Sequence, residues 1–131
     1  MIKAKLISKK QNDEIAALKF CTASKQELFM VAIGIASKLE LGEWVDCEVK
    51  SSDVIVSKTK LKECSLSNEI ECVIKEMEVG KILTSLVLSA KDFTLNSIIT
   101  SNSARRLNLK LEERVYAYIK ATQIYIKERL C

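Results

Sequence analysis

The side chains best placed to do chemistry in this sequence include hydroxyls beside a short predicted helix. Thr100 and Ser103 flank the expected start of a helix through residues 104–107, with Ser101 or Asn102 as its cap. Hydroxyls and free backbone amides at a helix start can hold an anion without a covalent bond. The same hydroxyls can also serve only as helix caps, and the two roles do not exclude each other.

Two lysines, Lys50 and Lys120, each end a segment that alternates apolar and polar residues. An ammonium group at that point can add a charge-assisted hydrogen bond to an anion. A lysine at a strand end is also a common solvated guard of a sheet edge. Arg105 and Arg106, in the predicted helix, are expected to be surface charges. The residues therefore indicate either non-covalent anion binding or an ordinary charged surface.

Histidine and proline are absent from the sequence, which has only three glycines. Without histidine, neither a Ser-His or Cys-His triad nor a histidine metal site can form. Three isolated glycines cannot build a Walker loop or a dinucleotide fingerprint. The five cysteines are odd in number and never spaced as C-x-x-C, which argues against a disulfide framework or a zinc site. We predict a protein that is not an enzyme and has no cofactor or directly bound metal ion.

The 131 residues carry a net charge of +4, with 48% hydrophobic and 29% charged residues. This composition is typical of a soluble globular protein. The longest stretch without a charged residue, residues 82–90, is far shorter than the ~20 apolar residues that cross a bilayer. The N-terminal segment does not resemble a signal peptide. We expect a cytoplasmic protein without a membrane segment.

Alternation of apolar and polar residues predicts β-strands over much of the chain. The best examples are residues 44–50 and 114–120, in which every second side chain is apolar. Residues 82–89 form a nearly continuous apolar run that predicts a buried strand, and residues 14–22 are a weaker counterpart. Residues 70–79 fit either a helical face or an alternating strand, so their periodicity is ambiguous.

The chain repeats itself at a constant offset of 70 residues. Residues 39–56 align with residues 109–126, and leucine, glutamate, valine and lysine recur at matching positions. Two copies of a five-strand unit with one short helix are the natural interpretation, and such a unit is typical of a small OB-like barrel. We predict an all-β protein of two tandem OB-like five-stranded barrels, each with a short helix. Residues 1–60 would form the first, degenerate barrel and residues 65–131 the second.

The second copy resembles a known family. It contains Ile-Thr-Ser-Asn-Ser-Ala, then Leu-Asn-Leu-Lys-Leu-Glu-Glu-Arg-Val, and closes with Ile-Lys-Ala-Thr. These elements, in this order, are similar to the Mop, or TOBE, domain. The first copy has the related segments Leu-Gly-Glu and Val-Lys-Ser-Ser-Asp-Val. The whole chain therefore resembles tandem di-Mop proteins, namely molbindins or the sensor half of the molybdate-responsive repressor.

The resemblance implies oxyanion sites between barrels. The implied donors are hydroxyls, backbone amides and lysines, namely Thr100, Ser103, Lys120, Ala121, Lys50, Ser51, Ser65 and Ser67. Ser67 stands where the family has an arginine, so a bidentate positive group is missing. The first copy lacks the hydroxyl motif, because residues 32–38 read Ala-Ile-Gly-Ile-Ala-Ser-Lys. We therefore expect the first copy to contribute only its lysine and the serine that follows.

By this resemblance the protein binds molybdate or tungstate reversibly, for intracellular storage, buffering or sensing. We expect a homo-oligomer, a dimer or trimer, because the implied sites lie between barrels. A regulator or a transporter component is a further candidate partner. The alternative function is a degenerate di-Mop scaffold that acts through protein contacts without oxyanion. Single-stranded nucleic acid is the least favoured ligand, since aromatic residues make up only 5% of the chain.

Overall fold

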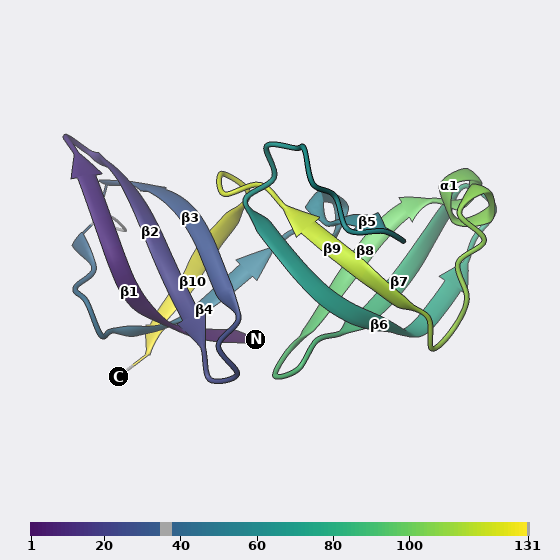
Figure 1. Ribbon diagram of the computed structural model, residues 1–131, viewed down its shortest axis with the longest axis horizontal. Coiled ribbons are helices and arrows are strands. Elements are labelled where there is room, and N and C mark those ends of the chain that lie inside the picture. The colour runs from purple at the N-terminus through teal and green to yellow at the C-terminus, as the bar shows by residue number, and fades with distance from the viewer. Residues whose placement is uncertain (35–37, 131) are drawn as a thin grey trace.

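The computed structural model describes residues 1–34 and 38–130, which form an all-β protein with two five-stranded antiparallel sheets (Figure 1). Its strands are β1 (Ile2–Asn12), β2 (Ile15–Thr22), β3 (Glu27–Ile33), β4 (Trp44–Val49), β5 (Ile55–Ser57), β6 (Asn68–Val79), β7 (Leu83–Ser89), β8 (Thr94–Thr100), β9 (Arg114–Ile119) and β10 (Ile124–Leu130). A 3₁₀ turn, η2 (Ser51–Asp53), precedes β5, and one α-helix, α1 (Ser101–Arg106), follows β8. This arrangement matches the predicted pair of OB-like barrels.

Each sheet takes one strand from the other half of the chain. The strand order is β10-β4-β1-β2-β3 in the first sheet and β5-β9-β6-β7-β8 in the second. Ile126 of β10 lies opposite Cys47 of β4, and Val56 of β5 lies opposite Ala117 of β9. The two pairings are equivalent under the 70-residue repeat. The sheets therefore do not follow the sequence halves strand for strand, and the division into residues 1–60 and 65–131 stays a prediction.

Each barrel is closed by the connection that leads into the exchanged strand. Val31 N in the edge strand β3 donates to Ala121 O between β9 and β10, over 2.9 Å. In the other barrel, Ser97 Oγ in the edge strand β8 donates to Val54 O beside η2, over 2.8 Å. Val54 and its repeat equivalent Ile124 are each only 2% exposed. The two crossing connections are thus packed parts of the barrels.

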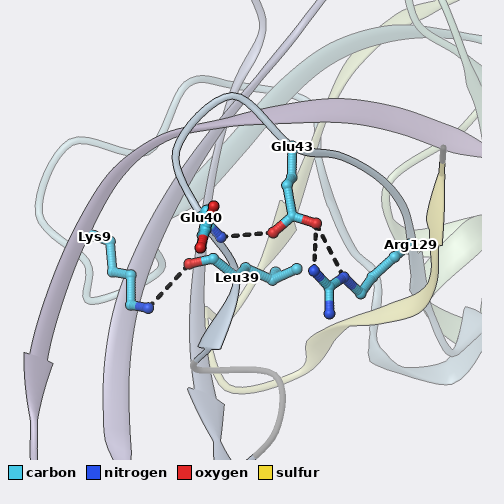
Figure 2. A network of polar contacts seen from close by, with 5 residues as sticks. All are labelled: Lys9, Leu39, Glu40, Glu43 and Arg129. Carbon is cyan, nitrogen blue, oxygen red and sulfur yellow. Dashed lines mark hydrogen bonds and ion pairs between the residues drawn. The ribbon is translucent and has the colours of Figure 1, made fainter.

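The turn before β4 docks on β1 and on the end of β10 (Figure 2). Lys9 Nζ donates to Leu39 O over 3.0 Å, and Leu6 N donates to Glu43 O over 2.9 Å. Gly42 has a φ of 92°, a left-handed conformation that glycine adopts without steric cost. The same turn therefore reaches both the first strand and the last strand of the chain.

Burial on one face explains how the ambiguous segment folds. Ile70, Cys72 and Ile74 of β6 are buried and the residues between them point outward, so alternation predicts this segment correctly. The apolar run at residues 82–89 is a strand, but only one of its faces is buried. Leu83, which faces outward, is 55% exposed. The expectation of a buried strand therefore holds for one face of β7, because this sheet covers the core with one face only.

The predicted helix in the second copy is present but begins earlier than expected. Its cap is Thr100, whose Oγ1 accepts a hydrogen bond from Ser103 N over 3.1 Å, so Ser101 and Asn102 are not caps. The helix expected in the first copy would fall in a segment that includes residues 35–37, outside the described residues. Within the described parts of the chain, no helix is long and apolar enough to cross a membrane.

Candidate functional site

A short series of hydrogen bonds links Thr100, Ser103 and Arg106 along one face of α1, and we call these residues the helix donor set. Thr100 Oγ1 donates to Ser103 Oγ over 2.9 Å, and Arg106 Nη2 donates to the same oxygen over 3.2 Å. Because Ser103 Oγ accepts twice, its own O–H remains to donate outward. Ser103 is half-buried and Arg106 is exposed. The set therefore offers a hydroxyl and a guanidinium to an anion from solvent.

Ser101 fixes the position of this helix start. Its side chain is fully buried, and its Oγ donates to Gly80 O over 2.6 Å. The same oxygen lies 2.8 Å from Thr84 Oγ1, and Ser101 N donates to Ile82 O over 2.8 Å. These bonds tie α1 to the turn between β6 and β7. Ser101 is therefore an anchor of the helix donor set and does not face solvent itself.

The predicted donors Lys120 and Ala121 lie in the connection between β9 and β10. Lys120 is exposed, and within the described residues its side chain makes no ion pair. The carbonyl of Ala121 closes the first barrel through Val31, as described above. Lys120 therefore presents a free ammonium group at the seam between the barrels.

The predicted donors Ser65 and Ser67 lie in the segment that leads into β6, and both are exposed. The register of β6 with β9 pairs Asn68 with Ile119. Ser67 directly precedes this pair and Lys120 directly follows it, so these two predicted donors lie at the same end of the β6–β9 pairing.

Lys50 and Ser51, the donors predicted in the first copy, line a cleft of about 760 Å³ between β4, η2, β8 and β10. The other charged residues in the lining of this cleft are Lys127, Asp46, Glu48 and Glu128. Carboxylates repel an oxyanion, so this cleft is a poorer anion site than the helix donor set.

The two lysine-bearing connections lie side by side at the seam, because Gln123 Nε2 in one donates to Asp53 Oδ1 in the other over 3.4 Å. Helix α1 lies at the outer end of the second barrel, away from this seam (Figure 1). The chain therefore brings Lys50 and Lys120 into one region but leaves the helix donor set apart from both.

Asn68 is a buried polar residue that joins the two sheets and that the sequence pattern did not single out. Its fully buried amide accepts from Phe29 N over 2.6 Å and donates to Phe29 O over 2.9 Å and to Ile119 O over 3.2 Å. It thus joins β3 of one barrel to β9 of the other. The available signal was its place at the first inward-facing position of an alternating segment, where a polar residue must find partners.

The buried thiols are not poised for chemistry. Burial raises the pKa of the Cys47 thiol to about 12 and that of the Cys72 thiol to about 11. Both are protonated at neutral pH and cannot act as nucleophilic thiolates. Among the described residues, no cluster of three His, Cys, Asp or Glu side chains is placed to hold a metal ion.

Comparisons with known proteins agree with this fold. Residues 65–126, which contain the helix donor set, match the family model of the TOBE domain. The solved structure of the cytoplasmic molybdate-binding protein ModG, in a PEG-grown form with molybdate bound, matches this chain with a TM-score of 0.89. The match covers 95% of this chain and 92% of that chain at 20% sequence identity, which establishes the shared fold. No curated protein matches the sequence.

Proposed function

We propose, because residues 65–126 match the family model of the TOBE domain, that this protein binds molybdate or tungstate reversibly. The observation that carries the proposal is the helix donor set, which lies inside the family segment and opens to solvent. ModG, which has the same fold, binds molybdate. Intracellular storage, buffering or sensing is the role that such reversible binding serves. The proposed role is binding in the cytoplasm and involves no catalysis.

The helix donor set suits an oxyanion for a simple electrostatic reason. A tetrahedral dianion presents only acceptor oxygens, so its site needs O–H and N–H donors together with positive charge. Ser103 supplies the hydroxyl and Arg106 the guanidinium, and their mutual hydrogen bond holds both in place. The Arg105 side chain makes no hydrogen bond or ion pair with the described residues, so it adds only long-range attraction.

The site is completed between chains in this proposal. One chain holds the helix donor set and Lys120 apart, so the lysine of a second copy would approach Ser103. Exposed apolar side chains support such a contact, since Ile82 is 76% and Leu83 is 55% exposed beside α1. Apolar groups exposed next to a polar site are typical of association surfaces. We therefore propose a dimer or trimer.

Isothermal titration of the purified protein with molybdate and tungstate tests the proposal, with sulfate and phosphate as controls. We expect saturable binding of molybdate or tungstate and a clear loss of affinity in Lys120→Ala. The matched control is Lys10→Ala, which removes an exposed lysine of β1 that is not among the predicted donors. Absence of binding heat with every oxyanion would refute the function. Unchanged affinity in Lys120→Ala would refute the role of that residue.

A scaffold that acts through protein contacts is the second candidate function. It is favoured by the cleft around Lys50, where the carboxylates of Asp46, Glu48 and Glu128 also line the wall. A regulator or a transporter component is the kind of partner such a scaffold would take. A thermal unfolding temperature that molybdate and tungstate leave unchanged in the assembled oligomer would favour this candidate over oxyanion binding.

A further inference from the structure

A second cleft, of about 660 Å³, lies between the barrels and shares no residue with the oxyanion donors. Its walls come from the β2–β3 turn of the first barrel and the β7–β8 turn of the second. Figure 1 shows both turns on the same side of the molecule, with β6 above them. Residues of β6 and Arg114 at the start of β9 complete the lining. The proposed oxyanion function leaves this cleft unexplained.

Hydrogen bonds hold both turns in place. Ser24 N in the β2–β3 turn donates to Asp92 Oδ2 in the β7–β8 turn, over 2.9 Å. Gln26 Nε2 crosses to the second barrel and donates to Glu69 O over 3.0 Å. Because the turns are fixed to each other and to β6, the cleft exists before any ligand arrives, which lowers the entropic cost of binding.

The charge of the cleft is positive. Its cationic lining residues are Lys25, Lys75, Lys91 and Arg114, and its acidic ones are Glu71 and Asp92. Arg114 lies 2.9 Å from Glu71 and Lys75 lies 3.0 Å from Glu112, while Asp92 keeps its charge and accepts a hydrogen bond from the Ser24 amide. Lys25 and Lys91, one from each barrel, make no ion pair with the described residues. Two free ammonium groups therefore border a preformed cleft from opposite barrels.

The remaining lining is partly apolar. Val73, Cys72 and Ala90 contribute to the wall, together with Phe93, whose side chain is 8% exposed. A cleft of this size falls within the roughly 300–1,000 Å³ that small organic ligands occupy. A single inorganic oxyanion would fill only a small part of the cleft and would leave its apolar wall exposed to water.

We propose that this cleft binds a nucleoside monophosphate, with the phosphate held by Lys25 and Lys91. The phosphate monoester supplies the dianion that two unpaired lysines favour. The flat base and the sugar occupy the rest of the cleft against the wall that includes Phe93. This site is separate from the proposed oxyanion site and does not depend on it.

Equilibrium binding of the common ribonucleoside monophosphates to the full chain at low salt tests this inference. The double variant Lys25→Gly with Lys91→Ala removes the two ammonium groups that are proposed to hold the phosphate. Glycine suits position 25, where φ is 74°, so this substitution does not strain the turn. Lys10→Ala again serves as the matched control, and thermal unfolding confirms that each variant is folded.

We expect saturable binding of at least one nucleotide, weakened about tenfold or more in the double variant and unchanged in Lys10→Ala. The unphosphorylated nucleoside should bind far more weakly than the nucleotide. Molybdate titration should be the same in the double variant and the unsubstituted protein. Lack of saturable binding by every nucleotide, equal binding of inorganic phosphate, or full affinity in the double variant would each overturn the proposal.

Discussion

Glu43 and Glu113, which are 70 residues apart, hold the two exchanged strands by the same pair of interactions. Each carboxylate accepts a hydrogen bond from the backbone amide three residues earlier, over 2.6 Å and 3.0 Å respectively. Each also binds a cation that follows or ends the exchanged strand. Arg129 Nε on β10 donates to Glu43 Oε1 over 3.0 Å (Figure 2), and Lys58 after β5 lies 3.0 Å from Glu113. The repeat therefore preserves the glutamate and its backbone hydrogen bond, whereas the cation differs by one position, since Lys58 aligns with Glu128 and Arg129 with Thr59.

Glu43→Gln should lower the thermal unfolding temperature near neutral pH. The Glu40 amide and Arg129 hold the pKa of Glu43 below its ordinary value of 4.5. A carboxyl with a lowered folded pKa stabilises the fold above its unfolded pKa, and this contribution is lost as pH falls through the folded pKa. The difference from the unsubstituted protein should therefore shrink below about pH 4.5. Glu63→Gln, at an exposed carboxyl that makes no ion pair with the described residues, is the control. A pH-independent difference would contradict this assignment.

Asn68→Ala should destabilise the protein by about 1–3 kcal/mol, because the partly buried backbone groups of Phe29 and the buried carbonyl of Ile119 lose their partner. Asn68→Asp should be worse, since a carboxylate would face the two carbonyls to which the amide donates. Urea unfolding followed by circular dichroism measures both changes. Asn12→Ala, at the exposed end of β1, should be nearly neutral. An equally mild effect of all three substitutions would show that the barrels do not depend on this bridge.

Ser101 and Ser103 should separate stability from binding. Ser101→Ala removes a buried hydroxyl that hydrogen-bonds to Gly80 O and to the Thr84 hydroxyl. The loss of these two bonds should lower the free energy of unfolding by about 1–3 kcal/mol. Ser103→Ala keeps the helix cap, because the backbone amide of residue 103 can still donate to Thr100 Oγ1. This variant should therefore change stability little and weaken molybdate binding. Unfolding curves and calorimetric titrations of the two variants provide the comparison. The reverse pattern would place the hydroxyls in the opposite roles.

Arg106→Ala should weaken molybdate binding, whereas Arg105→Ala should leave it nearly unchanged. Both substitutions remove one exposed positive charge, but only Arg106 donates to Ser103 Oγ. Arg106→Lys should recover part of the affinity, because it restores the charge without the planar fork of donors. Titration calorimetry at one fixed salt concentration measures all three variants. Equal losses in the two alanine variants would mean that α1 contributes only diffuse charge.

The strands could be predicted from the sequence because burial on one face leaves a period of two. Residues 44–50 and 114–120 show it clearly, and they contain β4 and β9. The repeat then indicated two tandem barrels, the first of them degenerate. The helix cap was predicted one or two residues late, because Thr100, Ser101 and Asn102 are all good caps and the pattern does not distinguish them. Only the burial of the Ser101 side chain against the β6–β7 turn excludes it.

The strand exchange could not be predicted from the pattern. Val54 and Ile124 must be buried in either arrangement, and periodicity fixes which face is buried but not which sheet receives the strand. The contact of Arg106 with Ser103 was accessible in principle, because residues three apart on a helix are neighbours. Lys50 and Lys120 lie in one region because of the strand exchange. Their proximity could therefore not be predicted from the sequence either.

The exchange itself can be tested by cross-linking. Tyr125 of β10 lies opposite Glu48 of β4, and residues paired in antiparallel strands are about 4.5–5.5 Å apart at Cα, close enough for a disulfide. Glu48→Cys with Tyr125→Cys, in a Cys64→Ser background that removes an exposed thiol, should form an intrachain disulfide under mild oxidation. Ile55→Cys with Glu48→Cys is the matched control, because under the repeat those two residues would pair only if β5 stayed with its own half. Non-reducing electrophoresis distinguishes the two pairs, and cross-linking of the control pair alone would refute the exchange.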